Sequence, residues 1–147
     1  MISLDPDTGT IQWSLKGSSR FGLLTSDGHW LAISEGYQRI RLIDLQTKKT
    51  RWTIQAHRDN ISCLTISPDG KTLASSSSDG TAKLWNIATG QEMFSYSAPS
   101  VAFSTAFSPD GTWWAVGSGT QRGNQVALFR RATTAEIEAA GAEAHAK

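Results

Sequence analysis

The chain has 147 residues, of which 39% are hydrophobic and 18% charged, and its formal net charge at pH 7 is +1. These values describe one ordinary globular domain, and they exclude the strongly basic surface that nucleic-acid binders carry. No apolar stretch reaches the roughly 20 residues of a membrane-spanning helix, and the first ten residues do not have the composition of a secretory signal. We therefore expect a cytoplasmic protein that contacts neither nucleic acid nor membrane.

An internal repeat organises the chain. Asp-Gly pairs that begin at Asp27, Asp69 and Asp110 recur at intervals of 42 and 41 residues, each between two short β-rich runs. An Asp-Gly pair in this setting indicates a tight hairpin turn of the primed type, because glycine adopts positive φ at no steric cost. A period of about 40 residues built from short strands is typical of the four-stranded blades of a β-propeller.

The repeat predicts an all-β fold of about three to three and a half antiparallel, four-stranded blades in an incomplete or unusually small ring. Residues 1–15 supply the last two strands of a partial blade, and residues 16–55 form a full blade. Residues 56–98 form a second full blade with the clearest pattern, and residues 99–131 form a partial blade of three strands. In the clearest blade we expect strands at residues 61–67, 72–76, 82–86 and 92–97.

The last segment, residues 132–147, changes in character and is rich in Ala and Glu. Thr133 and Glu136 have the spacing of a capping box, which favours a short helix at this point. Gly141 and the lack of an apolar stripe make a disordered tail the alternative.

The central stretch, "AHRDNISCLTISPDGKTLASSSSDGTAKLWN", resembles the WD40 repeat of β-propeller proteins, and the likeness extends over roughly residues 2–131. His57 stands at the family's repeat histidine, Asp79 at its tight-turn aspartate and Trp85 at its strand tryptophan. The alanine-rich ending is similar to the tails of bacterial WD40 arrays. The resemblance therefore implies the C-terminal blades of a bacterial-type array.

The resemblance also implies a structural tetrad, a hydrogen-bonded chain of His57, Ser75, Asp79 and Trp85. Such a chain is chemically consistent, because an indole only donates, a carboxylate only accepts, and a hydroxyl and an imidazole can do both. Ser, His and Asp are also the residues of a nucleophilic triad. However, the serine run contains no Gly-x-Ser-x-Gly elbow, so we expect these residues to stabilise the fold and the protein to be no enzyme.

Other chemistry has few candidates. His29 and His145 are isolated from other metal-ligating residues, and the single cysteine, Cys63, stands in an apolar run typical of a buried side chain. The glycine-rich segment Gly117–Gly123 lacks the Gly-Lys-Ser/Thr of a phosphate-binding loop. We expect no metal site and no cofactor.

The number of blades raises a question of completeness, since propellers close with about four to eight blades. Three explanations stay open. The chain is the C-terminal fragment of a longer propeller, or it completes a ring with another chain, or it closes as a small irregular propeller in which residues 10–15 supply an outer strand.

The resemblance to WD40 proteins implies a non-catalytic scaffold that binds a protein or peptide, with further WD40 blades upstream or from another chain as additional partners. By alignment, the loops on the tetrad side carry polar side chains able to make charge-assisted contacts. The expected protein-binding face consists of Arg20, Arg58, Asp59, Asn60, Ser78 and Arg122.

A second class of function also stays open. The segment "LDPDTGTIQW" resembles part of the quinoprotein-type propellers, some of which are dehydrogenases that use pyrroloquinoline quinone. This alternative requires a much longer periplasmic enzyme with a signal peptide and calcium-binding carboxylates, and neither feature occurs in these 147 residues.

Overall fold

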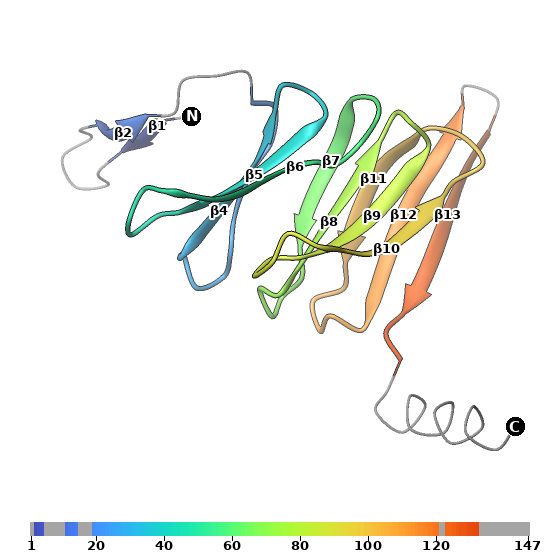
Figure 1. Cartoon of the computed structure of the whole chain (residues 1–147). Coiled ribbons are helices and arrows are strands. Elements are labelled where there is room, and N and C mark those ends of the chain that lie inside the picture. Colours follow the sequence, from blue (N-terminus) through green and yellow to red (C-terminus); the bar gives the residue numbers. More distant parts are fainter. Residues whose placement is uncertain (1, 5–10, 15–18, 121–122, 133–147) are drawn as a thin grey trace, which may run out of the picture.

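The computed structural model describes residues 2–4, 11–14, 19–120 and 123–132 (Figure 1). These residues form thirteen β-strands in four antiparallel sheets, and no helix occurs among them. Most of the segment 132–147, for which a helix or disorder is predicted, lies outside the described residues.

Three of the sheets stand side by side as blades (Figure 1). The first blade contains β3 (Gly22–Leu24), β4 (Trp30–Glu35), β5 (Arg39–Asp44) and β6 (Thr50–Gln55). The second contains β7 (Ile61–Ile66), β8 (Thr72–Ser77), β9 (Thr81–Asn86) and β10 (Glu92–Ser97). The third contains β11 (Ala102–Phe107), β12 (Trp113–Thr120) and β13 (Gly123–Arg130). A separate sheet pairs β1 (Ile2–Leu4) with β2 (Ile11–Ser14).

Within each blade, every strand pairs with its neighbours in chain order, as a propeller blade requires. The first strands of the three blades are adjacent, since β7 contacts both β3 and β11. The predicted all-β fold of antiparallel blades is confirmed, and the four strands of the second blade lie within one residue of their predicted bounds.

The Asp-Gly turns differ from the prediction in their type. Gly28, Gly70 and Gly111 have φ values of +70°, +69° and +70°, whereas the residues just before them do not have positive φ. In the second blade Gly70 N donates to Ser67 O at 2.9 Å, so residues 67–70 form a turn that ends in a left-handed glycine. The primed type is wrong here because Pro68 is a central residue of the turn and its ring fixes φ at a negative value.

Two hydrophobic clusters fill the spaces between neighbouring blades. The cluster between the first two blades is built from aliphatic and aromatic residues of both: Ala32, Ile40, Leu42, Ala56, Ile61, Leu64, Leu73, Trp85 and Ile87. Between the second and third blades, the small side chains of Ala74 and Ala82 face the larger Trp114 and Val116. Strand β8 contributes to both clusters, which is why five of its six residues are buried.

The described strands do not close a ring (Figure 1). β2 pairs with β1, and β13 pairs with β12 and with no other described strand. The alternative in which residues 10–15 close a small ring is therefore wrong for the part of that segment that is described, Ile11–Ser14. The third blade ends with three strands among the described residues, as predicted for residues 99–131.

Candidate functional site

The structure brings the four tetrad residues together across the first and second blades. His57 follows β6, Ser75 lies in β8, Asp79 in the turn between β8 and β9, and Trp85 in β9. Trp85 Nε1 donates to Ser75 Oγ at 2.8 Å, and Ser75 Oγ lies 2.7 Å from His57 Nε2. His57 Nδ1 lies 3.2 Å from Asp79 Oδ2, which completes a continuous chain from indole to carboxylate.

The direction of these hydrogen bonds follows from the donors. Because the indole can only donate, the hydroxyl of Ser75 accepts from Trp85 and gives its own hydrogen to His57 Nε2. His57 Nδ1 then carries the ring hydrogen and directs it towards Asp79 and Thr81, whose Oγ1 lies 3.0 Å away. The imidazole is thus held in its neutral Nδ1–H form.

Thr81 is a fifth member of the network that the sequence analysis missed. Its hydroxyl donates to Asp79 Oδ1 at 2.6 Å, and its backbone N–H donates to the same oxygen at 2.9 Å. The signal was present in the sequence, since a threonine two residues after an aspartate in a turn can bond back to that carboxylate.

Burial and the network shift the pKa of both ionisable members. Burial lowers the pKa of His57, and the charge and hydrogen bond of Asp79 oppose this effect only in part. For Asp79, burial raises the pKa, but hydrogen bonds from the Thr81 hydroxyl, from Arg58 N and from Thr81 N, together with His57, outweigh it and hold the pKa at about 2. At neutral pH the pair is therefore a neutral imidazole beside a carboxylate.

The order Ser75, His57, Asp79 matches that of a nucleophilic triad, but access to the serine distinguishes the two roles. Ser75 has 0% of its surface exposed, and its oxygen already accepts the hydrogen of Trp85. A cleft of about 440 Å³ lies against His57 and Asp79, and Ser75 is not among its lining residues. A substrate carbonyl could not reach the hydroxyl, so this geometry supports a structural role.

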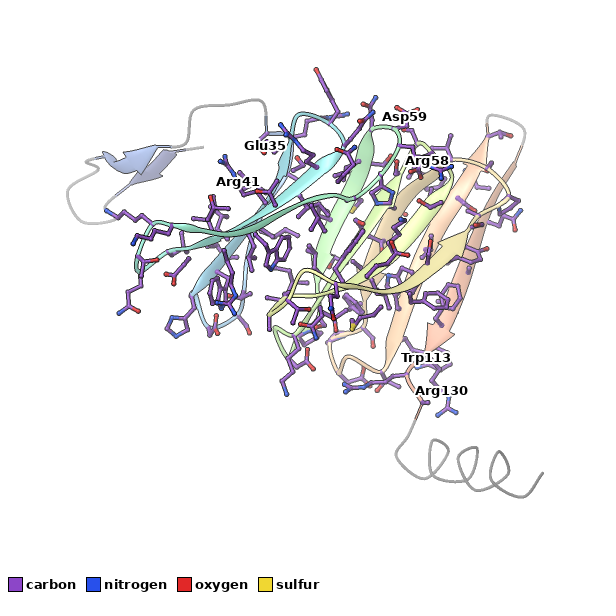
Figure 2. All side chains as sticks on the ribbon, in the orientation of Figure 1. Glu35, Arg41, Arg58, Asp59, Trp113 and Arg130 are labelled. Carbon is purple, nitrogen blue, oxygen red and sulfur yellow. The ribbon has the colours of Figure 1, made fainter. Side chains whose placement is uncertain are left out.

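The network also fixes a loop at the rim of the second blade, which we call the tetrad rim and define as Arg58, Asp59, Asn60 and Ser78. Figure 2 labels Arg58 and Asp59 of this rim. Arg58 N donates to Asp79 Oδ2 at 2.9 Å, and Arg58 O accepts from Gln38 Nε2 at 3.0 Å. Asp59 O accepts from Ser77 Oγ at 3.2 Å, and Asn60 O accepts from Ser78 N at 2.9 Å. The backbone is therefore tied at each of three successive residues, all of which are exposed.

The other predicted face residues have different positions. Arg20 is exposed just before β3, and its backbone N–H donates to Ser34 Oγ at 3.1 Å. Ser78 is half-buried, with its Oγ 3.5 Å from Ser62 Oγ. Arg122 lies outside the described residues. Of the six predicted face residues, the structure thus brings together the four of the tetrad rim.

The opposite end of the blades carries a second recurring motif that the sequence analysis did not identify. In each turn a hydroxyl donates to the aspartate two residues later, in the pairs Thr25 with Asp27, Ser67 with Asp69, and Ser108 with Asp110. The hydrogen bond from Ser108 is the main cause that lowers the pKa of Asp110, to about 2. These aspartates are already bonded within their own turns, so they stabilise turns.

Neither a metal centre nor a membrane-spanning helix occurs among the described residues. In the described residues no three His, Cys, Asp or Glu side chains are grouped closely enough to hold a metal ion. Within that same part, no helix is long and apolar enough to cross a membrane. His145 and residues 5–10 of the quinoprotein-like segment are not described.

Comparison with known proteins agrees with these structural observations. The family model described as "WD domain, G-beta repeat" (WD40) matches residues 48–86, which run from the turn before β6 to the end of β9. The matched repeat therefore contains the outer strand of the first blade and three strands of the second. This places the tetrad histidine at the junction of two blades.

Three curated relatives show the same likeness. The chain is 38% identical over 69 residues to small ribosomal subunit protein RACK1z of Arabidopsis thaliana, which covers 47% of this chain and 21% of the relative. It is 31% identical over 99 residues to the U3 small nucleolar RNA-associated protein 21 homolog of Schizosaccharomyces pombe, in a match that covers 65% of this chain and 11% of the relative. It is 35% identical over 78 residues to groucho of Drosophila melanogaster, in a match that covers 53% of this chain and 11% of the relative. The chain thus spans about a fifth or less of each relative, and these eukaryotic proteins give no support for a bacterial origin.

Proposed function

We propose that this chain, which contains a WD40 repeat, is a non-catalytic scaffold module that binds an extended segment of a partner protein at the tetrad rim. WD-repeat relatives such as RACK1 and groucho support a role in protein interaction. The expected cytoplasmic location is part of this proposal. No observation favours the quinoprotein alternative.

One observation carries the proposal, namely that the tetrad rim combines a fixed backbone with exposed polar side chains. Hydrogen bonds hold the main chain of Arg58, Asp59 and Asn60, while their side chains extend into solvent. A loop that is already ordered loses little further backbone entropy when a partner binds. Charged side chains on such a loop can then make contacts whose geometry is set in advance.

We also propose that the complete scaffold has further blades. In β5, Ile40 and Leu42 each have 0% of their surface exposed, because the second blade covers them. Val126 and Leu128 stand at the same positions of β13, and they are 68% and 64% exposed. The difference is the cover that a following blade supplies, which supports further WD40 blades from the same protein or from another chain.

The experiment uses the purified chain and a library of displayed peptides. Peptides selected against the chain are synthesised, and their dissociation constants are measured by calorimetry. The double variant Arg58→Ala/Asp59→Ala should weaken binding by about tenfold or more, because it removes two charged contacts. The control Lys71→Ala changes an exposed charge beside the Asp-Gly turn of the opposite end and should leave the affinity unchanged.

Equal affinity of the double variant and the unchanged chain would contradict the assignment of the tetrad rim. Failure of the library to yield any peptide above background would contradict the peptide-binding role. Thermal unfolding of the double variant serves as a check, and we expect a melting temperature close to that of the unchanged chain because both side chains are exposed.

A further inference from the structure

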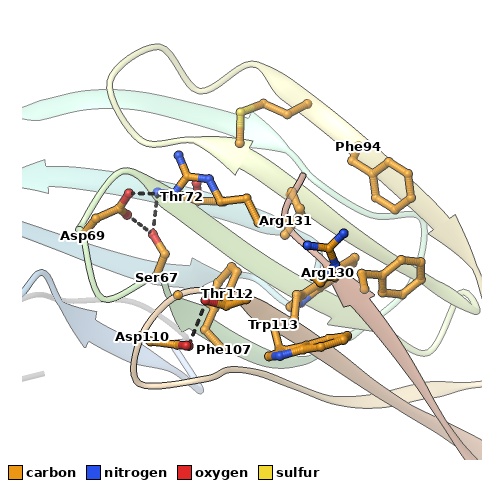
Figure 3. Close-up of a pocket in the computed structure, with 15 residues that line it drawn as sticks. Ser67, Asp69, Thr72, Phe94, Phe107, Asp110, Thr112, Trp113, Arg130 and Arg131 are labelled. Carbon is orange, nitrogen blue, oxygen red and sulfur yellow. Dashed lines mark hydrogen bonds and ion pairs between the residues drawn. The ribbon is translucent and has the colours of Figure 1, made fainter. Parts of the chain in front are cut away.

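A groove of about 490 Å³ is lined by residues of the second and third blades, at the end of the blades that carries the Asp-Gly turns (Figure 3). Its walls are largely aromatic. Phe94 meets Trp114 edge to face with ring centroids 6.0 Å apart, and it meets Phe129 at 5.6 Å. Trp114 and Phe129 are themselves 4.9 Å apart. Because these rings already pack against one another, little side-chain entropy is lost when a ligand binds to them.

Large apolar side chains are exposed around this groove. Met93, Phe94 and Trp113 all line it, and they are 50%, 43% and 44% exposed. Single exposed apolar side chains are ordinary, but a group of them around one concave surface marks a place where a partner binds. The groove is therefore suited to an apolar side chain from another molecule.

The groove is distinct from the face that a following blade would cover. Phe129 lines the groove and packs against the cluster between the second and third blades. Val126 and Leu128 lie on the other face of β13, because successive side chains of a strand point to opposite faces. A blade that covers Val126 and Leu128 therefore does not occupy the groove.

Arg131 brings a guanidinium group to this groove. Its backbone is fixed, since Arg131 N donates to Thr112 O at 2.8 Å. Its side chain is 75% exposed, and its ion pair with Asp69 spans 3.7 Å from Nη1 to Oδ2, which is longer than a hydrogen bond. No hydrogen bond joins this side chain to another residue in the part of the chain that the structure describes. A guanidinium placed in this way can bind a partner carboxylate through two parallel N–H donors.

The charges along the groove are arranged unevenly. Figure 3 shows Arg131 between the aspartates Asp69 and Asp110 on one side and Arg130 on the other. Each aspartate already accepts a hydrogen bond from the hydroxyl of its own turn. The charged residues that line the groove from Arg131 towards Arg130 are both positive. A carboxylate is attracted to that side and is repelled from the side of the aspartates.

We propose that this groove binds a segment of a partner protein in which an aromatic side chain is adjacent to acidic residues. The aromatic side chain packs against Phe94 and Trp113, and a neighbouring carboxylate binds Arg131. This site lies at the opposite end of the blades from the tetrad rim. It therefore goes beyond the function proposed above and does not depend on it.

Peptide titrations followed by NMR of the isotope-labelled full chain test the proposal. The probe is Ac-Gly-Ser-Trp-Glu-Glu-NH2, and its matched control has glutamine in place of both glutamates. The acidic peptide should bind more tightly by about threefold or more, as expected for an exposed ion pair, and should shift the indole N–H of Trp114 and the amide of Gly111. Arg131→Ala should abolish this preference, whereas Lys49→Ala, which removes an exposed charge from the first blade, should retain it.

Two further measurements separate the anchor from the charge. A probe with alanine in place of tryptophan should bind about tenfold more weakly or worse, because the aromatic anchor is lost. Phe94→Ala should weaken both tryptophan peptides and leave the preference for glutamate. Thermal unfolding of Arg131→Ala should give a melting temperature close to that of the unchanged chain, because the side chain is exposed.

Equal affinities of the acidic and glutamine peptides for the unchanged chain would overturn the proposal, as would shifts confined to residues outside the groove. Shifts of Trp114 and Gly111 that grow with protein concentration in the absence of peptide would also overturn it, because a second copy would then occupy the groove. The double variant Arg58→Ala/Asp59→Ala should bind the probe unchanged. Loss of binding in that variant would assign the probe to the tetrad rim and contradict a second site.

Discussion

Replacing Ser75 by alanine should destabilise the protein strongly, although it removes only one oxygen atom. That oxygen accepts from Trp85 Nε1 at 2.8 Å and lies 2.7 Å from His57 Nε2. Trp85 and His57 are both buried, so Ser75→Ala leaves a donor and an acceptor without partners where water cannot replace them. Each of the two orphaned groups costs about 1 to 3 kcal/mol, so the free energy of unfolding should fall by about 2 to 6 kcal/mol. At about 2 to 4 °C per kcal/mol for a chain of this length, the melting temperature should fall by about 4 to 24 °C.

The neighbouring residue Ser76 provides a matched control. It is also 0% exposed, and its Oγ has no hydrogen-bond partner. Because Ser76→Ala removes an unsatisfied buried hydroxyl, it should cost less than about 0.5 kcal/mol or even stabilise the protein. Urea unfolding of both variants, followed by tryptophan fluorescence, measures the difference. Equal losses in the two variants would refute the reasoning that the hydrogen bonds of Ser75, and not its volume, matter.

Three further outcomes follow from the same contacts. The lowered pKa of His57 means that the unfolded chain binds a proton more readily, so stability should be complete above the ordinary value of 6.5 and fall as the pH decreases below it. The pKa of Asp79 is lowered from 3.8 to about 2, so the free energy of unfolding should decrease further as the pH falls from 3.8 to about 2. Urea unfolding across this pH range should show a smaller decrease in the variant Asp79→Asn. In the same assay, Gly90→Ala should lower the free energy of unfolding more than Gly28→Ala. Both glycines have φ near +70°, but a Cβ at Gly90 would lie 3.0 Å from the Trp52 ring, whereas a Cβ at Gly28 would have no neighbouring atom within 4 Å. Equal costs would show that the ring moves aside freely.

The repeat made much of this fold predictable from sequence. Recurring Asp-Gly pairs and β-rich runs located the strands of the second blade to within one residue, because turn residues and strand periodicity act locally. The grouping of His57, Ser75, Asp79 and Trp85 came from the resemblance to WD40 repeats. Their contact joins residues up to 28 positions apart in two blades, which local pattern alone does not predict.

Other features depend on detail that pattern reasoning does not contain. The turn at residues 67–70 differs from the primed type that the Asp-Gly pair predicts, because the ring of Pro68 fixes a negative φ at a central position of the turn. Arg41 Nη2 lies 3.1 Å from Glu35 Oε1, a contact across the β4–β5 hairpin that needs the register of the two strands (Figure 2). The exposure of Val126 and Leu128 likewise depends on what lies beside β13, and sequence shows only that they are apolar.

Two of the three hydrophobic clusters among the described residues lie between blades, and this location has a consequence for cooperativity. Each blade gains its buried area from its nearest neighbours, so the stability of the array behaves approximately as a sum of blade and interface contributions. The second blade takes part in both clusters, whereas the third has one face without a described neighbour. Opening should therefore begin at the third blade and reach the second blade last. The repeat that carries the WD40 match is thus also the part of the chain from which folding can propagate in both directions.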